Sequence, residues 1–243
     1  MDIGIAHHKI ASIARGLAQE KQSTLNKLKA EYNNLSRPDF LWHYLLQSFS
    51  TMGRASGWDG LIGNKYNYNK LRYEALDKRP PSERVRVVAQ TCRDAKIRMP
   101  SVKADYILKC FEQVKSLGGP EAAKKMLFAQ EGREGKIRFL KRFSGIGDKY
   151  ARNIMMDVYH EDFRDSIALD IRIKSISEAF GLAFNSYTQH EEFYLSVAKE
   201  AGINGWELDR LIFNFKDRFL VGSGTTYPAK PNQGIHRTAC SRR

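Results

Sequence analysis

Two short segments of this sequence combine residue types that can bind phosphate and stabilise positive charge. In the first, a Gly-x-Gly turn at Gly145 and Gly147 separates two predicted helices, with Lys141, Arg142 and Lys149 around it. Glycines permit backbone geometry that a side chain forbids, and the next helix presents unpaired N–H groups and its positive dipole end outward. The pattern is typical of a hairpin that binds a nucleic-acid backbone without recognising its base sequence.

The second segment ends at Asp170, an acid that closes an apolar stretch and opens a predicted helix. The helix that begins near Lys149 carries the chain about 17 Å away, and the roughly nine residues after it can span roughly 30 Å. Asp170 can therefore return to the Lys149 end of that helix, so that the two side chains share a cleft. A plainer interpretation exists for each feature: Asp170 as a helix N-cap, Lys149 as a phosphate ligand, and Gly-x-Gly as a tight helix–helix turn.

The elements that must position these residues are helices. Apolar residues recur with the helical period of 3.6 in three stretches, 104–114, 151–158 and 208–219. Because strand-like alternation is scarce, we predict about ten helices and no sheet. The fold class is therefore all-α.

Prolines and glycines mark the boundaries of these helices. Helix starts are predicted at Pro38 and Pro81, and a break between two helices at Gly119. Two stretches are predicted to be irregular: residues 51–66, which hold four glycines, and the basic tail 221–243.

The composition indicates a polyanionic partner. The 243 residues include 40 Lys and Arg against 27 Asp and Glu, a formal net charge of +13, which favours nucleic acid over an anionic membrane. Cys92, Cys110 and Cys240 are too scattered for a zinc or iron–sulfur site, so we expect no metal and no cofactor. Neither a secretory signal nor a membrane span is predicted. We expect a monomer in the cytoplasm with the nucleoid, or in the nucleus or an organelle of a eukaryote.

Residues 139–173 resemble the HhH-GPD superfamily of base-excision DNA glycosylases, which includes endonuclease III and the 8-oxoguanine DNA glycosylases. The family pattern is an apolar-Pro-Gly-apolar-Gly-x-Lys-x-Ala hairpin, followed by a Val-Asp-like acid at a helix start. Residues 99–108 also look like a Lys-Ala-acid helix of the family, and residues 41–50 like the helix before its lesion-side loop. The pattern stands here as Phe143-Ser144-Gly145-Ile146-Gly147-Asp148-Lys149-Tyr150-Ala151, then Leu169-Asp170.

The resemblance implies a role for individual residues. Lys149 falls on the family's Schiff-base lysine and Asp170 on its essential aspartate. The glycines of the hairpin, with Lys141 and Arg142, would bind the DNA backbone. Ser144 replaces the usual proline, which loosens the turn, and the four-cysteine iron–sulfur cluster of many members cannot be built in this chain.

The resemblance also implies two helical lobes with a DNA cleft between them. A six-helix barrel would cover residues 37–160 and contain the helix-hairpin-helix at 136–159. The N-terminal helix, within residues 1–36, would pack with a C-terminal lobe of residues 161–220, and residues 221–243 would form a flexible tail.

A glycosylase must extrude its target base into a pocket, because the sugar C1′ atom is inaccessible in stacked duplex DNA. Met52 or Arg54, after the helix that resembles the lesion-side one, would fill the gap left in the stack. Trp206, Asp209 and Phe213 lie on the helix that corresponds to the one lining the family's pocket. An aromatic ring would stack on the base and Asp209 would read its edge, although aromatic residues at helical spacing are more often core.

These observations predict a DNA glycosylase that excises a damaged or modified base from duplex DNA and nicks the strand as an AP lyase. An oxidised purine, 8-oxoguanine, is the first substrate that we expect. The alternatives are a glycosylase for a mismatched pyrimidine or for a modified base of foreign DNA, and a non-catalytic DNA-binding protein that uses the hairpin only to hold the backbone.

Overall fold

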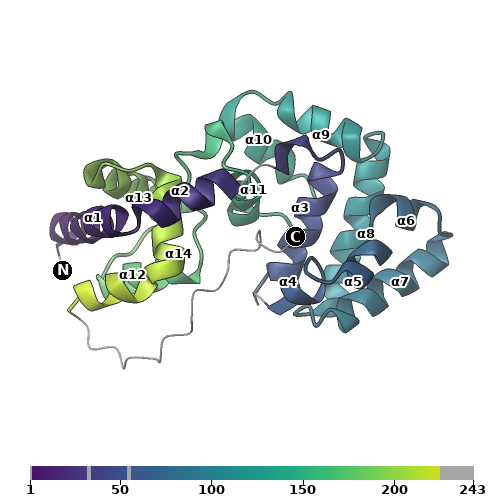
Figure 1. Ribbon diagram of the computed structural model, residues 1–243, viewed down its shortest axis with the longest axis horizontal. Helices are drawn as coiled ribbons and strands as arrows, with labels where there is room; N and C mark the ends of the chain where they lie inside the picture. The colour runs from purple at the N-terminus through teal and green to yellow at the C-terminus, as the bar shows by residue number, and fades with distance from the viewer. Residues whose placement is uncertain (1, 32–33, 54–55, 225–243) are drawn as a thin grey trace. The chain divides into compact units, whose positions relative to one another are not determined.

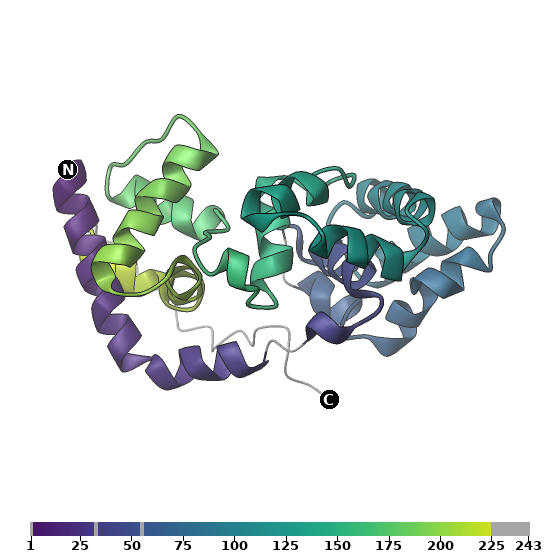
Figure 2. The same ribbon diagram turned by 90° about the horizontal axis from the view of Figure 1, so that it is seen from above.

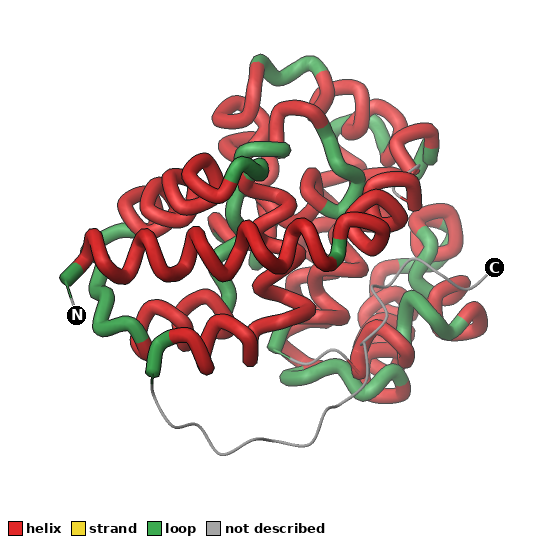
Figure 3. Tube along the Cα trace, turned by 60° about the vertical axis from the view of Figure 1, so that its left-hand side comes forward, coloured by secondary structure: helices red, strands yellow, loops and turns green. Residues whose placement is uncertain are grey.

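The computed structural model describes residues 2–31, 34–53 and 56–224. In these ranges the regular structure consists of fourteen α-helices and two short 3₁₀ helices, without any strand. Figure 3 shows the trace as helices joined by loops. The all-α prediction is confirmed. None of the described helices is long and apolar enough to cross a membrane. Arg54 and the tail after Gly224 lie outside the described residues.

The chain divides into two compact units. Unit 1 contains the described residues of Met1–Asn33 and Met155–Arg243, and unit 2 is Asn34–Ile154. The boundary between Ile154 and Met155 falls within α11 (Asp148–Met156). The other elements of unit 2 are η1 (Asn34–Ser36), α3 (Phe40–Thr51), α4 (Ser56–Gly60), α5 (Lys65–Lys70), α6 (Tyr73–Asp77), α7 (Pro81–Asp94), α8 (Pro100–Ser116), α9 (Pro120–Phe128) and α10 (Gly132–Leu140).

Helix α3 forms the centre of unit 2. It packs against α4, α8 and α9, and nearly all of its residues are buried (Figure 1). A helix that is apolar all round belongs in a core, where Trp42 contacts Phe111 edge-on and donates from its indole Nε1 to the Leu71 carbonyl at 2.8 Å. The predicted helix starts near Pro38 and at Pro81, and the break at Gly119, match the starts of α3, α7 and α9.

Residues 51–66 are more regular than the sequence predicted. They contain α4 and the start of α5. A Cβ atom on Gly57 would lie 2.1 Å from the Ser50 carbonyl oxygen, and one on Gly60 would lie 2.1 Å from that of Ala95. The prediction of a loop was wrong because these glycines permit close packing of a helix rather than turns.

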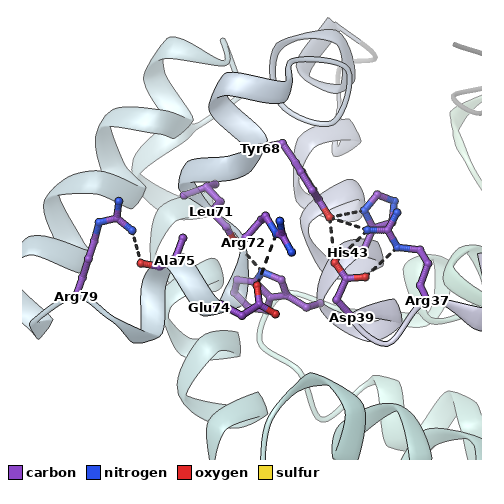
Figure 4. Close-up of polar contacts among 10 residues, drawn as sticks. Arg37, Asp39, His43, Tyr68, Leu71, Arg72, Glu74, Ala75 and Arg79 are labelled. Carbon is purple, nitrogen blue, oxygen red and sulfur yellow. Dashed lines mark hydrogen bonds and ion pairs between the residues drawn. The ribbon is translucent and has the colours of Figure 1, made fainter. Parts of the chain in front are cut away.

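A largely half-buried polar cluster holds the entry to α3 (Figure 4). The Arg37 guanidinium donates to both carboxylate oxygens of Asp39 at 3.0 Å and to the Tyr68 hydroxyl at 3.0 Å. Nδ1 of His43 lies 2.8 Å from the same hydroxyl. Burial lowers the pKa of His43 to about 4 and raises that of Tyr68 to about 12. The cluster ties η1, α3 and α5 together with a neutral histidine.

Unit 1 is built on α14, which packs against α1, α12 and α13 (Figure 1). After α1 ends, α2 continues in a new direction, as Figure 2 shows. Tyr194 and Trp206 are fully buried in the core of this unit. Its elements are α1 (Ile3–Glu20), α2 (Gln22–Glu31), η2 (Glu161–Phe163), α12 (Ile171–Ala179), α13 (Tyr187–Ala201) and α14 (Gly205–Gly222).

Candidate active site

The predicted hairpin joins α10 to α11 and rests on α8. Gly145 has a φ of +81°, a backbone conformation that L side chains rarely adopt. A Cβ atom there would lie 2.5 Å from Cδ2 of Tyr106. Gly147 is exposed, with nothing within 4 Å of the position that a Cβ would take. The two glycines therefore differ: Gly145 lets the hairpin lie on α8, whereas Gly147 leaves open space before α11.

Gln113 of α8 clamps the same hairpin through its amide. Its Nε2 donates to the Arg142 carbonyl at 2.7 Å, and its Oε1 accepts from the Ser144 backbone N–H at 3.1 Å. Proline has no N–H to donate. The clamp therefore explains how this chain tolerates serine where the family pattern has proline, since Ser144 supplies a hydrogen bond that compensates for the less rigid turn.

The charges at the hairpin are arranged around α11. Lys149 is the second residue of this helix, and its half-buried side chain lies with Nζ 4.8 Å from the centre of the Tyr150 ring. Lys141 pairs with Asp148 at 2.7 Å, so its charge is partly balanced within the hairpin. Arg142 is exposed. The hairpin keeps the cationic side chains expected from the sequence, and Asp148 balances part of their charge.

Side chains of α13 and α14 hold the extended segment that leads to Asp170. Three consecutive backbone N–H groups, at residues 167–169, donate in turn to Glu191 Oε1 at 3.1 Å, Asp209 Oδ1 at 3.0 Å and the Tyr187 hydroxyl at 3.0 Å. The Tyr187 hydroxyl also donates back to the carbonyl of residue 167 at 3.0 Å. Buried backbone N–H groups need hydrogen-bond partners, and here side chains provide them rather than a neighbouring strand. These bonds fix the position of the backbone just before Asp170.

Asp170 is the N-cap of α12. Its Oδ1 accepts from the backbone N–H groups of Arg172 at 2.8 Å and Ile173 at 3.2 Å. Its Oδ2 accepts from the Arg172 guanidinium at 2.7 Å. The Asp170 side chain is 12% exposed. The capping role considered from the sequence is therefore present, and the carboxylate is held in one orientation by three hydrogen bonds.

The residues predicted to line a base pocket fall in different environments. Trp206 is fully buried and donates from its indole Nε1 to the Met156 carbonyl at 2.8 Å. Asp209 is also buried, and its Oδ1 accepts from a backbone N–H of the segment before Asp170. Phe213 is half-buried, and the Arg172 guanidinium lies 4.1 Å from the centre of its ring. Helical spacing places the three on one helix but cannot distinguish core from pocket.

Met52 lies at the C-cap of α3 beside a lysine that the sequence did not single out. Lys103 of α8 is 9% exposed, and its Nζ lies 3.1 Å from the Met52 sulfur and 5.1 Å from the centre of the Tyr106 ring. Burial, and secondarily Arg98, lowers the pKa of Lys103. The sequence signal for this lysine was the Lys-Ala-acid helix at 99–108, in which it stands in the first turn after a proline.

No cofactor donors gather near these residues. Among the described residues, no group of three or more His, Cys, Asp and Glu side chains is arranged to hold a metal ion. Cys92 and Cys110 are buried, and burial raises the pKa of each thiol to about 12. The residues singled out here carry lysine, carboxylate and guanidinium groups. Lys149 belongs to unit 2 and Asp170 to unit 1, and their pairing stays a prediction.

Comparison with solved structures identifies the fold. The 8-oxoguanine DNA glycosylase of Thermotoga maritima aligns with a TM-score of 0.63 and 16% sequence identity, over 85% of this chain and 95% of its own. That of Methanocaldococcus jannaschii aligns with a TM-score of 0.63 and 14% identity, over 88% and 96% of the two chains. This chain has the fold of 8-oxoguanine DNA glycosylases.

A further structure with this glycosylase fold contains nucleic acid. The M. jannaschii 8-oxoguanine glycosylase/lyase in complex with 15mer DNA containing 8-oxoguanine aligns with a TM-score of 0.60 and 15% identity, over 84% of this chain and 94% of its own. Neither protein-family models nor curated proteins match this chain. The likeness therefore lies in the fold rather than in the sequence as a whole.

Proposed function

We propose that this protein is a DNA glycosylase that removes 8-oxoguanine from duplex DNA and then nicks the strand as an AP lyase. The observation that carries the proposal is the α10–α11 hairpin, with Gly145 seated on Tyr106 and Lys149 at the start of α11, in a chain with the 8-oxoguanine glycosylase fold. The exposed N–H end of α11 and Gly147 would bind a phosphate of the DNA backbone. The net charge of +13 favours the same partner.

Lys149 is the proposed nucleophile. Its neutral amine attacks C1′ of the damaged nucleotide while the electron pair of the glycosidic bond passes to the base, which leaves with a proton. Ring opening then gives a Schiff base between Lys149 Nζ and C1′. Loss of a C2′ proton and departure of the 3′ phosphate by β-elimination nick the strand.

Asp170 is the proposed stabiliser of the transition state. Cleavage of the glycosidic bond develops positive charge on the sugar, and a fixed carboxylate beside it lowers the barrier because no reorganisation is required. The hydrogen bonds from the start of α12 and from Arg172 hold the Asp170 carboxylate in place. The role as an N-cap and the proposed role in catalysis are thus compatible.

Borohydride trapping tests this proposal. Wild-type protein, duplex DNA with one 8-oxoguanine and borohydride should give a covalent complex, because hydride reduces the Schiff base to a stable amine. Lys149→Gln should abolish both the complex and the nick while duplex binding falls only modestly, since one phosphate contact is lost. Lys125→Gln is the matched change at an exposed lysine of α9 in the same unit and should trap like wild type.

Three outcomes would contradict parts of the proposal. Base release without trapping would make Lys149 a phosphate ligand and water the nucleophile. Trapping that persists in Lys149→Gln would mean that another amine attacks. Absence of base release from the wild-type protein, tested also with mismatched pyrimidines and other modified bases, would leave only the DNA-binding role.

A further inference from the structure

The guanidinium of Arg172 is fixed on two sides. Along one edge it donates to Asp170 Oδ2 at 2.7 Å, and one of its faces lies over the Phe213 ring, 4.1 Å from the ring centre. These contacts join three elements of unit 1: the segment before α12, α12 itself and α14. A long, flexible side chain is thereby held as a planar group next to the proposed catalytic carboxylate.

The Arg172 side chain is not covered in this position. It keeps 36% of its surface exposed, whereas the Asp170 side chain keeps 12%. Phe213 occupies one face of the plane. The arginine keeps too much of its surface in solvent for its pairing with Asp170 to be a fully buried salt bridge, and a partly exposed ion pair contributes only modestly to stability. The position of Arg172 between Asp170 and Phe213 therefore needs an explanation other than stability.

We propose that Arg172 is the surface on which the extruded base stacks, with Phe213 as its support. This inference rests on the proposed glycosylase function. A carboxylate that stabilises charge on the sugar must lie beside C1′, and the base is bonded to the same atom. The guanidinium lies within one hydrogen bond of that carboxylate and so within reach of the base.

The guanidinium of Arg172 and the extruded base are both planar groups that can stack on each other. A guanidinium is flat, delocalised and weakly hydrated, and it stacks on nucleobases as readily as an aromatic ring. Its positive charge favours an electron-rich ring system, and a purine offers the larger face. Phe213, one of the two aromatic residues considered from the sequence for stacking, lies behind the guanidinium and fixes the orientation of its plane.

A comparison between two substrates isolates this role. One duplex carries 8-oxoguanine, and the other carries an abasic site at the same position, which Lys149 can open without any base present. Arg172→Lys keeps the positive charge and can still pair with Asp170, but the ammonium has no plane to stack. We expect Arg172→Lys to lower single-turnover release of 8-oxoguanine about 10-fold more than it lowers nicking of the abasic duplex.

Two further variants strengthen the comparison. Phe213→Leu removes the support of the guanidinium and should lower base release, with a smaller effect, without changing abasic-site nicking. Lys174→Gln removes an exposed cation of the same helix and should change neither rate. Thermal unfolding of each variant identifies any that fail to fold.

Each remaining outcome would overturn the inference. Equal losses of base release and abasic-site nicking in Arg172→Lys would mean that Arg172 acts through Asp170 or through a phosphate. Unchanged rates on both duplexes would mean that the guanidinium does not contact the base. If wild-type protein releases no base, the proposed function fails and this inference fails with it, an outcome that the wild-type reaction alone reveals.

Discussion

The two carboxylate oxygens of Asp170 have different partners. Oδ1 accepts the two backbone N–H groups that begin α12, so it carries the capping role. Oδ2 accepts from the guanidinium of Arg172, whose side chain is 36% exposed. This division lets one residue start a helix and present charge at the same time, and it makes the two roles separable by substitution.

Asp170→Asn should separate them. Asparagine caps a helix as well as aspartate does, so the free energy of unfolding should change by less than about 1 kcal/mol. The amide carries no charge, so single-turnover base release should fall by about 100-fold or more. Asp170→Ala, which removes the cap as well, should cost about 1 kcal/mol of additional stability. Urea unfolding and excision assays measure both effects, and near-normal excision by the asparagine variant would show that Asp170 is only a cap.

Single residues show where sequence reasoning reaches its limit. The sequence predicted that a helix begins directly after the hairpin and that another begins at Asp170, and the structure has both helix starts. Caps and glycine turns can be predicted in this way because local backbone geometry determines them. Trp206 and Asp209, which we predict to line a base pocket, are both buried and make hydrogen bonds within unit 1. The period of a helix gives the face on which a residue lies, but the neighbour that covers this face comes from distant parts of the chain.

The hairpin between α10 and α11 is held on α8 by residues from both sides. Gly145 lies on Tyr106, the Gln113 amide bonds the backbone of Arg142 and Ser144, and the Cys110 thiol lies 3.5 Å from the Ser144 carbonyl oxygen. The sequence predicted the hairpin but not Gln113, because an amide in the middle of a helix carries no local signal of its partner. The same holds for Glu191 and Tyr187, whose partners are backbone groups of another segment.

Gly145→Ala should displace this element, and Gly147→Ala provides the matched control. Alanine at 145 meets both a φ of +81° and the Tyr106 ring, so we expect a loss of about 2 kcal/mol or more in unfolding free energy. Alanine at 147 meets open space and should leave stability nearly unchanged. If Gly147 approaches a phosphate, the same variant should still weaken duplex binding. Equal stability of the two variants would show that the contact with Tyr106 does not hold the hairpin.

At the scale of the whole molecule, the net charge and the burial of two histidines differ in how far the sequence predicts them. Cations exceed acids by 13, so no fold can pair them all within the chain, and this excess was readable from composition. The burial of His43 and His190 was not, because each contacts residues outside its own helix. His43 contacts Tyr68 in unit 2, and His190 lies 2.8 Å from the Ser177 hydroxyl in unit 1 and stacks on Phe184.

These two histidines predict how stability depends on pH. Burial lowers the pKa of each to about 4, from the ordinary 6.5 that applies in the unfolded chain. As the pH falls below 6.5, the unfolded chain binds protons that the folded protein does not, so stability is lost between about pH 6.5 and pH 4 and falls no further from these groups below that range. Between pH 7 and pH 5, each histidine should lower the unfolding free energy by about 2 kcal/mol.

Urea unfolding at pH 7 and at pH 5 measures this loss. His43→Gln keeps a polar group beside Tyr68 but cannot be protonated in this range, so its loss between the two pH values should be about half that of wild type. His190→Gln should behave in the same way, and the double variant should show little pH dependence in this window. Because carboxylates titrate mainly below pH 5, they contribute little here. Equal stability of the wild-type protein at the two pH values would mean that neither histidine is kept neutral by the fold.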